Sequence, residues 1–267
     1  MALIDCHFFS ETLDMHCGMK VILPQPLARA PHWPRFDPAR GHPTLTLLHG
    51  LSDDHTAWAR QSAIERYVEG TGLAVVMPAG GRSFYSDMHH GPRYWQFLSE
   101  ELPRLARSFF PLSAARDDNY VAGLSMGGYG AFKLALHYPE RFAAAASLSG
   151  ALDMVRCAQD EAITHAGELH GIFGPPAHMA AQGNDLFALA RTVGERGRCP
   201  LLFQRCGTDD FLLDDNTRFA AHARQLGLPL DYTSGPGQHD WAYWDAQIQH
   251  VIAWLMQLRG QAGKASA

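Results

Sequence analysis

Apolar and polar positions follow two different patterns along this chain. Near the N-terminus they alternate residue by residue, which is typical of half-buried strands, so 2–9 and 15–23 are expected to pair as an antiparallel edge. Farther on, short apolar runs without alternation predict strands whose two faces are both buried. These runs cover 45–48, 73–77, 120–122, 142–148 and 201–203, and a further strand is expected at 229–233.

Segments with a helical spacing of apolar residues lie between these runs. They predict helices over 63–69, 94–110, 126–137, 216–226 and 241–258. Strands that alternate with helices in this order favour an α/β fold, with a mostly parallel central sheet and helices on both of its faces. The chain has 267 residues, a length at which such a fold commonly forms one domain, here 1–267.

One stretch, from about 151 to 199, interrupts the alternation. The run Gly171-Ile172-Phe173-Gly174-Pro175-Pro176 would break any continuous helix, and the stretch is too long for an ordinary connection. We expect a small cap insertion over the carboxyl ends of the strands, where open α/β sheets bind ligands. The alternative is a helical crossover with an elaborated loop.

Composition excludes several classes of function. A formal net charge of −5 without a long basic run argues against a nucleic-acid partner, and no uncharged apolar stretch is long enough for a membrane span. Asp5, Glu11 and Asp14 do not fit a secretory signal, so a cytoplasmic location is expected. Five cysteines without a C-x-x-C pair indicate reduced thiols, and the fifteen histidines lack metal-ligand spacing. No metal or other cofactor is expected.

The strongest chemical signal is Gly123-Leu124-Ser125-Met126-Gly127, between a predicted strand and a predicted helix. A G-x-S-x-G pattern in this setting is typical of a nucleophile elbow, a strained turn that projects the serine hydroxyl. Glycines on either side keep the turn free of side chains. Ser125 is therefore the candidate nucleophile.

A serine hydroxyl needs a base to become nucleophilic, and two segments supply candidates. Asp209 and Asp210 follow the strand at 201–203, and His239 lies on a Gly/Pro-rich loop before the last helix. The order serine, acid, histidine is that of α/β-hydrolases. Alone, these aspartates would be read as turn or helix-capping residues, and the histidine as a loop residue.

An oxyanion hole is expected from two backbone N–H groups. One is that of Met126, directly after the nucleophile, and the other is that of Leu51, in the run Leu47-Leu48-His49-Gly50-Leu51 after an early strand. The alternative for His49-Gly50 is a turn with a buried histidine. Both interpretations can hold together.

Several segments together resemble the putative-esterase, esterase D-like family of α/β-hydrolases. They are LLHGL, HTAW, MPAGGRSFYSDM, YWQFLSEELP, GLSMGGYGAF, CGTDDFLLDDN and GQHDWAYW, in the family's order. The resemblance implies Ser125 as nucleophile, His239 as base, Asp210 rather than Asp209 as acid, and oxyanion donors at Leu51 and Met126. The tributyrin esterase branch is most similar, because the glutathione-thioester hydrolases tend to have GHSMGGHGAL and a GLTC segment instead.

This resemblance implies a serine carboxylesterase that hydrolyses small-molecule esters with short acyl chains through an acyl-enzyme. S-formylglutathione hydrolysis, feruloyl or cinnamoyl ester hydrolysis, acyl transfer to an alcohol and a non-catalytic binding module stay open. The aromatic residues that flank the catalytic segments could wall the substrate pocket or belong to the core; they are Trp58, Trp95, Trp241, Tyr243 and Trp244. The exposed edge strands leave a homo-oligomer open.

Overall fold

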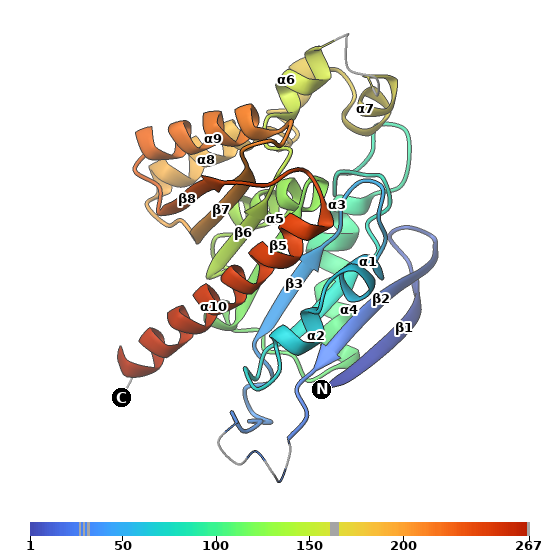
Figure 1. Cartoon of the computed structure of the whole chain (residues 1–267). Helices are drawn as coiled ribbons and strands as arrows, with labels where there is room; N and C mark the ends of the chain where they lie inside the picture. The colour runs from blue at the N-terminus through green and yellow to red at the C-terminus, as the bar shows by residue number, and fades with distance from the viewer. Residues whose placement is uncertain (27, 29, 31–32, 161–165, 266–267) are drawn as a thin grey trace.

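A mixed sheet of eight strands forms the centre of the molecule (Figure 1). The computed structural model describes residues 1–26, 28, 30, 33–160 and 166–265. The strand order is β1-β2-β4-β3-β5-β6-β7-β8; β1 and β2 pair antiparallel, β2 meets β4 antiparallel, and the other neighbours are parallel. The strands are β1 (Ala2–Ser10), β2 (Met15–Leu23), β3 (Thr44–Leu48), β4 (Ala74–Pro78), β5 (Asn119–Leu124), β6 (Ala144–Leu148), β7 (Leu201–Gly207) and β8 (Leu230–Gly235).

Helices cover both faces of this sheet, which confirms the predicted α/β class. One core joins the sheet to α1 (Ala57–Gln61), α2 (Ile64–Tyr67) and α10 (Trp241–Ala265). The other core joins the opposite face to α4 (Leu102–Phe109), α5 (Met126–His137), α8 (Leu186–Arg196) and α9 (Leu213–Gln225). The short elements are α3 (Tyr94–Gln96), η1 (Phe97–Glu101), η2 (Arg116–Asp118), α6 (Met154–Gln159), α7 (Ala166–Phe173) and η3 (Pro176–His178).

The predicted helix over 94–110 contains a π-helical turn, η1, between α3 and α4. Pro103 in the first turn of α4 has no N–H to donate and its ring would crowd the carbonyl four residues earlier. That carbonyl belongs to Ser99, and it accepts a hydrogen bond from Arg141 Nη1 at 2.9 Å instead. The wider turn thus accommodates the proline without leaving the carbonyl unpaired.

Strand β7 extends to Gly207, beyond the predicted 201–203. The polar residues that follow the apolar run are accommodated by tertiary contacts. Gln204 is buried and its amide donates to the carbonyl and side chain of Asn216, while the Arg205 guanidinium lies 3.7 Å from the ring centre of Phe203. The apolar run alone therefore gave too short a strand.

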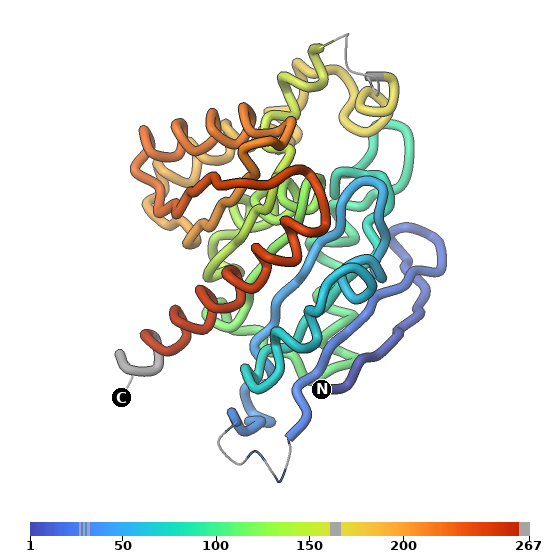
Figure 2. The backbone as a smooth tube through the Cα atoms, in the orientation of Figure 1, coloured from blue at the N-terminus to red at the C-terminus, as the bar shows by residue number. Residues whose placement is uncertain are grey.

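The segment 151–199 contains α6, α7, η3 and α8. In Figures 1 and 2, α6 and α7 lie at the end of the molecule farthest from both chain termini, beyond the sheet. Helix α8 instead packs against α5 and α9 in the layer that covers the sheet. Within the described residues, no helix has the length and apolarity needed to cross a bilayer.

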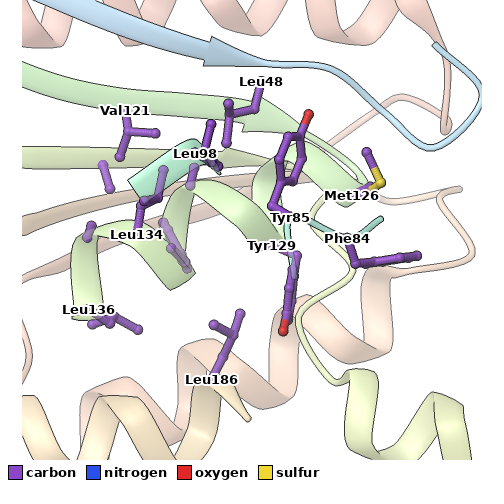
Figure 3. Close-up of a cluster of buried hydrophobic side chains, with 14 of the residues drawn as sticks. Leu48, Phe84, Tyr85, Leu98, Val121, Met126, Tyr129, Leu134, Leu136 and Leu186 are labelled. Atoms are coloured by element: carbon purple, nitrogen blue, oxygen red, sulfur yellow. The ribbon is translucent and has the colours of Figure 1, made fainter. Parts of the chain in front are cut away.

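Buried aromatic residues pack around the start of α5, where Figure 3 shows Tyr85 and Phe84 near Met126 and Tyr129. Tyr85 fits against two glycines: a Cβ at Gly80 would lie 2.3 Å, and one at Gly130 2.4 Å, from its ring. The hydroxyl of Tyr85 donates to the His49 carbonyl at 2.9 Å. This packing fixes the end of β3 relative to α5.

Lys133 on α5 is a buried cation without an ion-pair partner among the described residues. Its Nζ donates to Tyr85 O at 3.2 Å, Ser86 Oγ at 2.8 Å and Asn184 Oδ1 at 2.6 Å. Burial lowers the pKa of this ammonium to about 7. The lysine therefore ties α5 to two loops, and its charge responds to pH near neutrality.

The low pKa of Lys133 predicts a pH-dependent stability. Between about pH 7 and about pH 8.5 the Lys133 side chain binds fewer protons in the folded state than in the unfolded state, so its contribution to the free energy of unfolding should rise with pH, by up to ~1.4 kcal/mol per unit. Lys133→Met should flatten this rise, whereas replacing Lys20, which is paired with Asp5, by Met should keep it. Urea denaturation across this interval measures both, and an equal slope in Lys133→Met would contradict the prediction.

Candidate active site

Ser125 joins β5 to α5 in the strained turn that the sequence predicts. Its backbone has φ +52° and ψ −119°, a region that residues other than glycine seldom adopt. The flanking glycines are sterically required: a Cβ at Gly123 would lie 2.3 Å from the Gly127 carbonyl oxygen, and one at Gly127 2.4 Å from the Leu48 carbonyl oxygen. The serine side chain therefore stands at the carboxyl end of the sheet.

Three side chains from distant parts of the chain form a hydrogen-bonded row. His239 Nε2 lies 3.1 Å from Ser125 Oγ, and His239 Nδ1 lies 3.0 Å from both carboxylate oxygens of Asp210. Because the carboxylate only accepts, Nδ1 carries the ring proton, and Nε2 is free to accept the hydroxyl proton of the serine. This is the geometry of a nucleophile, a base and an orienting acid.

The Asp210 carboxylate is held in its ionised form. Its side chain is fully buried, and burial raises the pKa. The hydrogen bonds from His239 and from the Leu212 N–H, at 2.8 Å, outweigh this effect and leave the pKa below its ordinary value. The acid therefore stays charged at neutral pH, as stabilising an imidazolium requires.

The neighbouring acidic residues have other partners. Asp209 is exposed, and its N–H donates to the Gly237 carbonyl. Asp214 and Asp215, at the start of α9, pair with Arg156 on α6 at 3.1 and 2.6 Å. Of these four aspartates only Asp210 contacts the histidine, as the resemblance implies.

The turn after β3 is anchored by a buried histidine. His49 Nε2 accepts from the Gly80 N–H at 2.9 Å, so His49 Nδ1 carries the proton and donates to the Gly50 carbonyl at 2.7 Å. Burial lowers the pKa of His49, which keeps the ring neutral. The interpretation of His49-Gly50 as a turn with a buried histidine is therefore correct. It is compatible with the binding of an oxyanion by the backbone of the same turn.

The two expected oxyanion donors lie on this turn and at the elbow. A Cβ at Gly50 would lie 3.8 Å from Ser125 Cβ and 2.7 Å from Leu124 Cδ1, so the turn passes directly against the elbow. Within the described part of the chain, neither the Leu51 nor the Met126 N–H has a hydrogen-bond acceptor. Leu51 lines the cavity above Ser125, whereas Met126 is buried directly after the serine.

A cavity of about 840 Å³ opens above Ser125. Its wall combines the turn after β3, the loops that carry Ser125, Asp210 and His239, and residues of α6 and α7. The lining residues used below are Leu51, Asp53, Arg82, Ser125, Met154, Arg156, Leu169, Phe211, Asp215, His239, Asp240, Trp241 and Trp244. The predicted cap segment thus contributes Met154, Arg156 and Leu169 to the wall.

Only part of the predicted aromatic wall lines this cavity. Trp241 and Trp244 do, whereas Trp58 is buried beneath Trp241 and donates from its indole to the Leu48 carbonyl. Trp95 packs against Tyr138 on the other side of the sheet, and Tyr243 packs on Gly237. The pocket assignment was therefore wrong for Trp58, Trp95 and Tyr243, because aromatic residues beside helices also fill the core.

Arg82 and Phe211 are among the residues of the cavity wall that the sequence analysis did not identify. Arg82 forms a paired contact with Glu168 on α7, at 2.6 and 2.8 Å, and donates to the Leu51 carbonyl. The Phe211 ring contacts His239 in a tilted arrangement, with ring centres 4.5 Å apart. The position of Phe211 directly after Asp210 could have indicated that it lies at the site. No local sequence pattern links Arg82 to α7.

Comparison with known proteins agrees with this geometry. The family model described as "Putative esterase" matches residues 10–255. The chain belongs to this family. It is a carboxylic ester hydrolase of the serine hydrolase type with an α/β-hydrolase fold, as predicted.

Three relatives are similar over nearly their whole length. The acetyl esterase of Caldicellulosiruptor saccharolyticus is 28% identical over 265 residues, 97% of this chain and 99% of the relative. The Staphylococcus aureus fluorophosphonate-binding serine hydrolase FphF superposes with a TM-score of 0.85 at 34% identity, covering 96% and 98% of the two chains. The S-formylglutathione hydrolase FrmB of the same species has a TM-score of 0.81 at 35% identity and the same coverage.

The crowding at the elbow predicts that Gly127→Ala disrupts the site. Because the new methyl would overlap the Leu48 carbonyl, α5 must shift, and we expect esterase activity to fall at least ~100-fold with a lower melting temperature. Gly171→Ala on α7 is the matched control, since a Cβ there meets nothing within 4 Å. Equal activity and melting temperature in the two variants would contradict the steric role of Gly127.

Proposed function

We propose that this esterase hydrolyses short-chain acyl esters of small molecules through a Ser125 acyl-enzyme. The observation that carries the proposal is the row Ser125 Oγ, His239 and Asp210, with contacts of 3.1 and 3.0 Å at the floor of a cavity. Membership of an esterase family supports the same chemistry.

In the proposed first step, His239 Nε2 takes the hydroxyl proton as Ser125 Oγ attacks the ester carbonyl. Asp210, through Nδ1, holds the ring in the required tautomer and stabilises the imidazolium that forms. The protonated histidine then gives its proton to the leaving alkoxide, and the acyl group stays on the serine. In the second step water replaces the alcohol and repeats the sequence.

The oxyanion of each tetrahedral intermediate would be bound by the N–H groups of Leu51 and Met126. Both lack acceptors among the described residues, and both belong to rigid turns beside Ser125. Donors fixed before the reaction stabilise developing charge at little reorganisation cost. His49 contributes by holding the turn, since it binds the Gly50 carbonyl and the Gly80 N–H at once.

The short acyl chain is supported by the acetyl esterase that resembles this chain from end to end. We also propose that α6 and α7 act as a cap. Met154 and Leu169 of these helices line the cavity, and the Arg82–Glu168 pair joins α7 to the loop after β4. The cap would shield the acyl-enzyme while leaving space for the alcohol part of the ester.

S-formylglutathione hydrolysis is a second candidate, because FrmB is similar over nearly its whole length. The charges of the cavity wall favour neutral esters instead. Asp53, Asp215 and Asp240 line the cavity, and both lining arginines already bind carboxylates: Arg82 pairs with Glu168, and Arg156 with Asp214 and Asp215. Glutathione brings two carboxylates and one ammonium, so its net charge would be repelled.

Hydrolysis of p-nitrophenyl esters tests the main proposal. Wild-type kcat/KM should be highest between acetate and butyrate and fall toward octanoate. Ser125→Ala should lower kcat on the acetate about a million-fold, as expected for residues that act as one unit. Labelling by a fluorophosphonate probe should be lost in the same variant.

Two results would overturn the proposal. Ser125→Ala enzyme that keeps most of its turnover would exclude the acyl-enzyme, and a rate that rises past octanoate would exclude the short-chain preference. A circular dichroism spectrum of Ser125→Ala that matches the wild type would show that a loss of turnover is not due to unfolding.

Thioesters that share an acetyl group test the second candidate. We expect kcat/KM for uncharged S-acetyl-N-acetylcysteamine to exceed that for S-acetylglutathione about tenfold, a ratio that should shrink with added salt because screening weakens repulsion. Asp240→Asn should raise the glutathione value, while its amide can still accept the Tyr243 N–H as Asp240 does at 2.9 Å. A faster reaction with S-formylglutathione than with p-nitrophenyl acetate would instead favour glutathione thioester hydrolysis.

A further inference from the structure

Phe211 is a large apolar side chain left in solvent beside the triad. It is 77% exposed, more than any other large apolar side chain in the described part of the protein. Its ring lies against His239, with centres 4.5 Å apart and planes at 46°, and it lines the cavity. An apolar face of this size at the mouth of a cavity is a surface that a bound molecule can cover.

The mechanism places one part of the substrate next to this ring. His239 Nε2 must reach the leaving oxygen to protonate it, so the alcohol part of an ester departs on the His239 side of Ser125. Phe211 touches that same imidazole, and Trp244 meets it edge to face with centres 4.9 Å apart. Trp241 continues this wall beside Trp244, at 5.5 Å. The leaving-group side is therefore aromatic.

We propose that Phe211 determines specificity for the leaving group, by covering the apolar part of alcohols larger than ethanol. The inference rests on the proposed acyl-enzyme, in which His239 faces the alcohol. It names a substrate class for this site: esters of short acids with apolar or aryl-bearing alcohols. Trp241 and Trp244 form the rest of the same surface.

A purely positional role for Phe211 is less consistent with the contacts. His239 is already held by both carboxylate oxygens of Asp210 at 3.0 Å and by the nearly buried Trp244 ring. A ring used only to support the imidazole would be buried against other side chains. Phe211 instead keeps most of its surface free.

The ratio of kcat/KM for 2-phenylethyl acetate to that for ethyl acetate measures this contact. Both esters form the same acetyl-enzyme, and kcat/KM reports the steps up to loss of the alcohol. Phe211→Ala should lower the ratio about tenfold, the effect of covering on the order of 50 Å² of apolar surface. Phe211→Leu should lower it less. Phe9→Ala is the matched control, since Phe9 on β1 is 49% exposed and distant in the fold from the cavity wall.

The outcomes separate this inference from the proposed function. The inference would be overturned if Phe211→Ala lowered kcat/KM for both esters equally, so that their ratio stayed at the wild-type value, and displaced the pH profile of kcat/KM. That result would show that Phe211 only positions His239. A lowered ratio with an unchanged pH profile supports it. Hydrolysis of either ester that persists in Ser125→Ala would overturn the acyl-enzyme itself, whatever Phe211 does.

Discussion

The backbone strain at Ser125 is the constraint on which the site depends. A positive φ at a residue other than glycine costs on the order of 1–3 kcal/mol, so its surroundings must enforce it. The Ser125 N–H donates to the Leu148 carbonyl, and its own carbonyl accepts from the N–H groups of Tyr129 and Ala151. Ser149, directly after β6, also has a positive φ, +49°, and its N–H donates to the Arg205 carbonyl on β7. Three neighbouring strand ends thus hold the elbow.

The turn after β3, which carries the proposed oxyanion donor Leu51, is held in place by buried hydrogen bonds instead of strained backbone. His49 joins the turn to the end of β4, and the Tyr85 hydroxyl joins it to the loop packed against α5. Each buried polar atom in this network has a partner, and an unpaired one would cost about 1–3 kcal/mol. The network is therefore rigid, which is what donors aimed at a transient charge require.

The parts of the fold that sequence predicted are those set by local pattern. The elbow follows from glycine spacing between a strand and a helix, and most strands follow from apolar runs. The predictions that failed depended on contacts between distant segments. The amide NH2 of Gln204, in the extended part of β7, donates to Asn216, and Trp58 belongs to the core, where Leu48 accepts its indole N–H. No local pattern shows which face of a helix meets the cavity, so the aromatic wall was only partly identified.

Parts of the cavity wall are held by weaker interactions than the turn that carries Ser125. The Arg82–Glu168 and Arg156–Asp214 pairs are partly exposed, and such pairs typically contribute less than ~1 kcal/mol. Phe211 buries only a small part of its surface. Substitutions at Arg82 or Phe211 can therefore alter the cavity wall at little cost to folding, whereas substitutions under Ser125 disturb both the fold and the site. The similarity of this chain to both an acetyl esterase and an S-formylglutathione hydrolase agrees with this division, because proteins of one fold can differ in substrate.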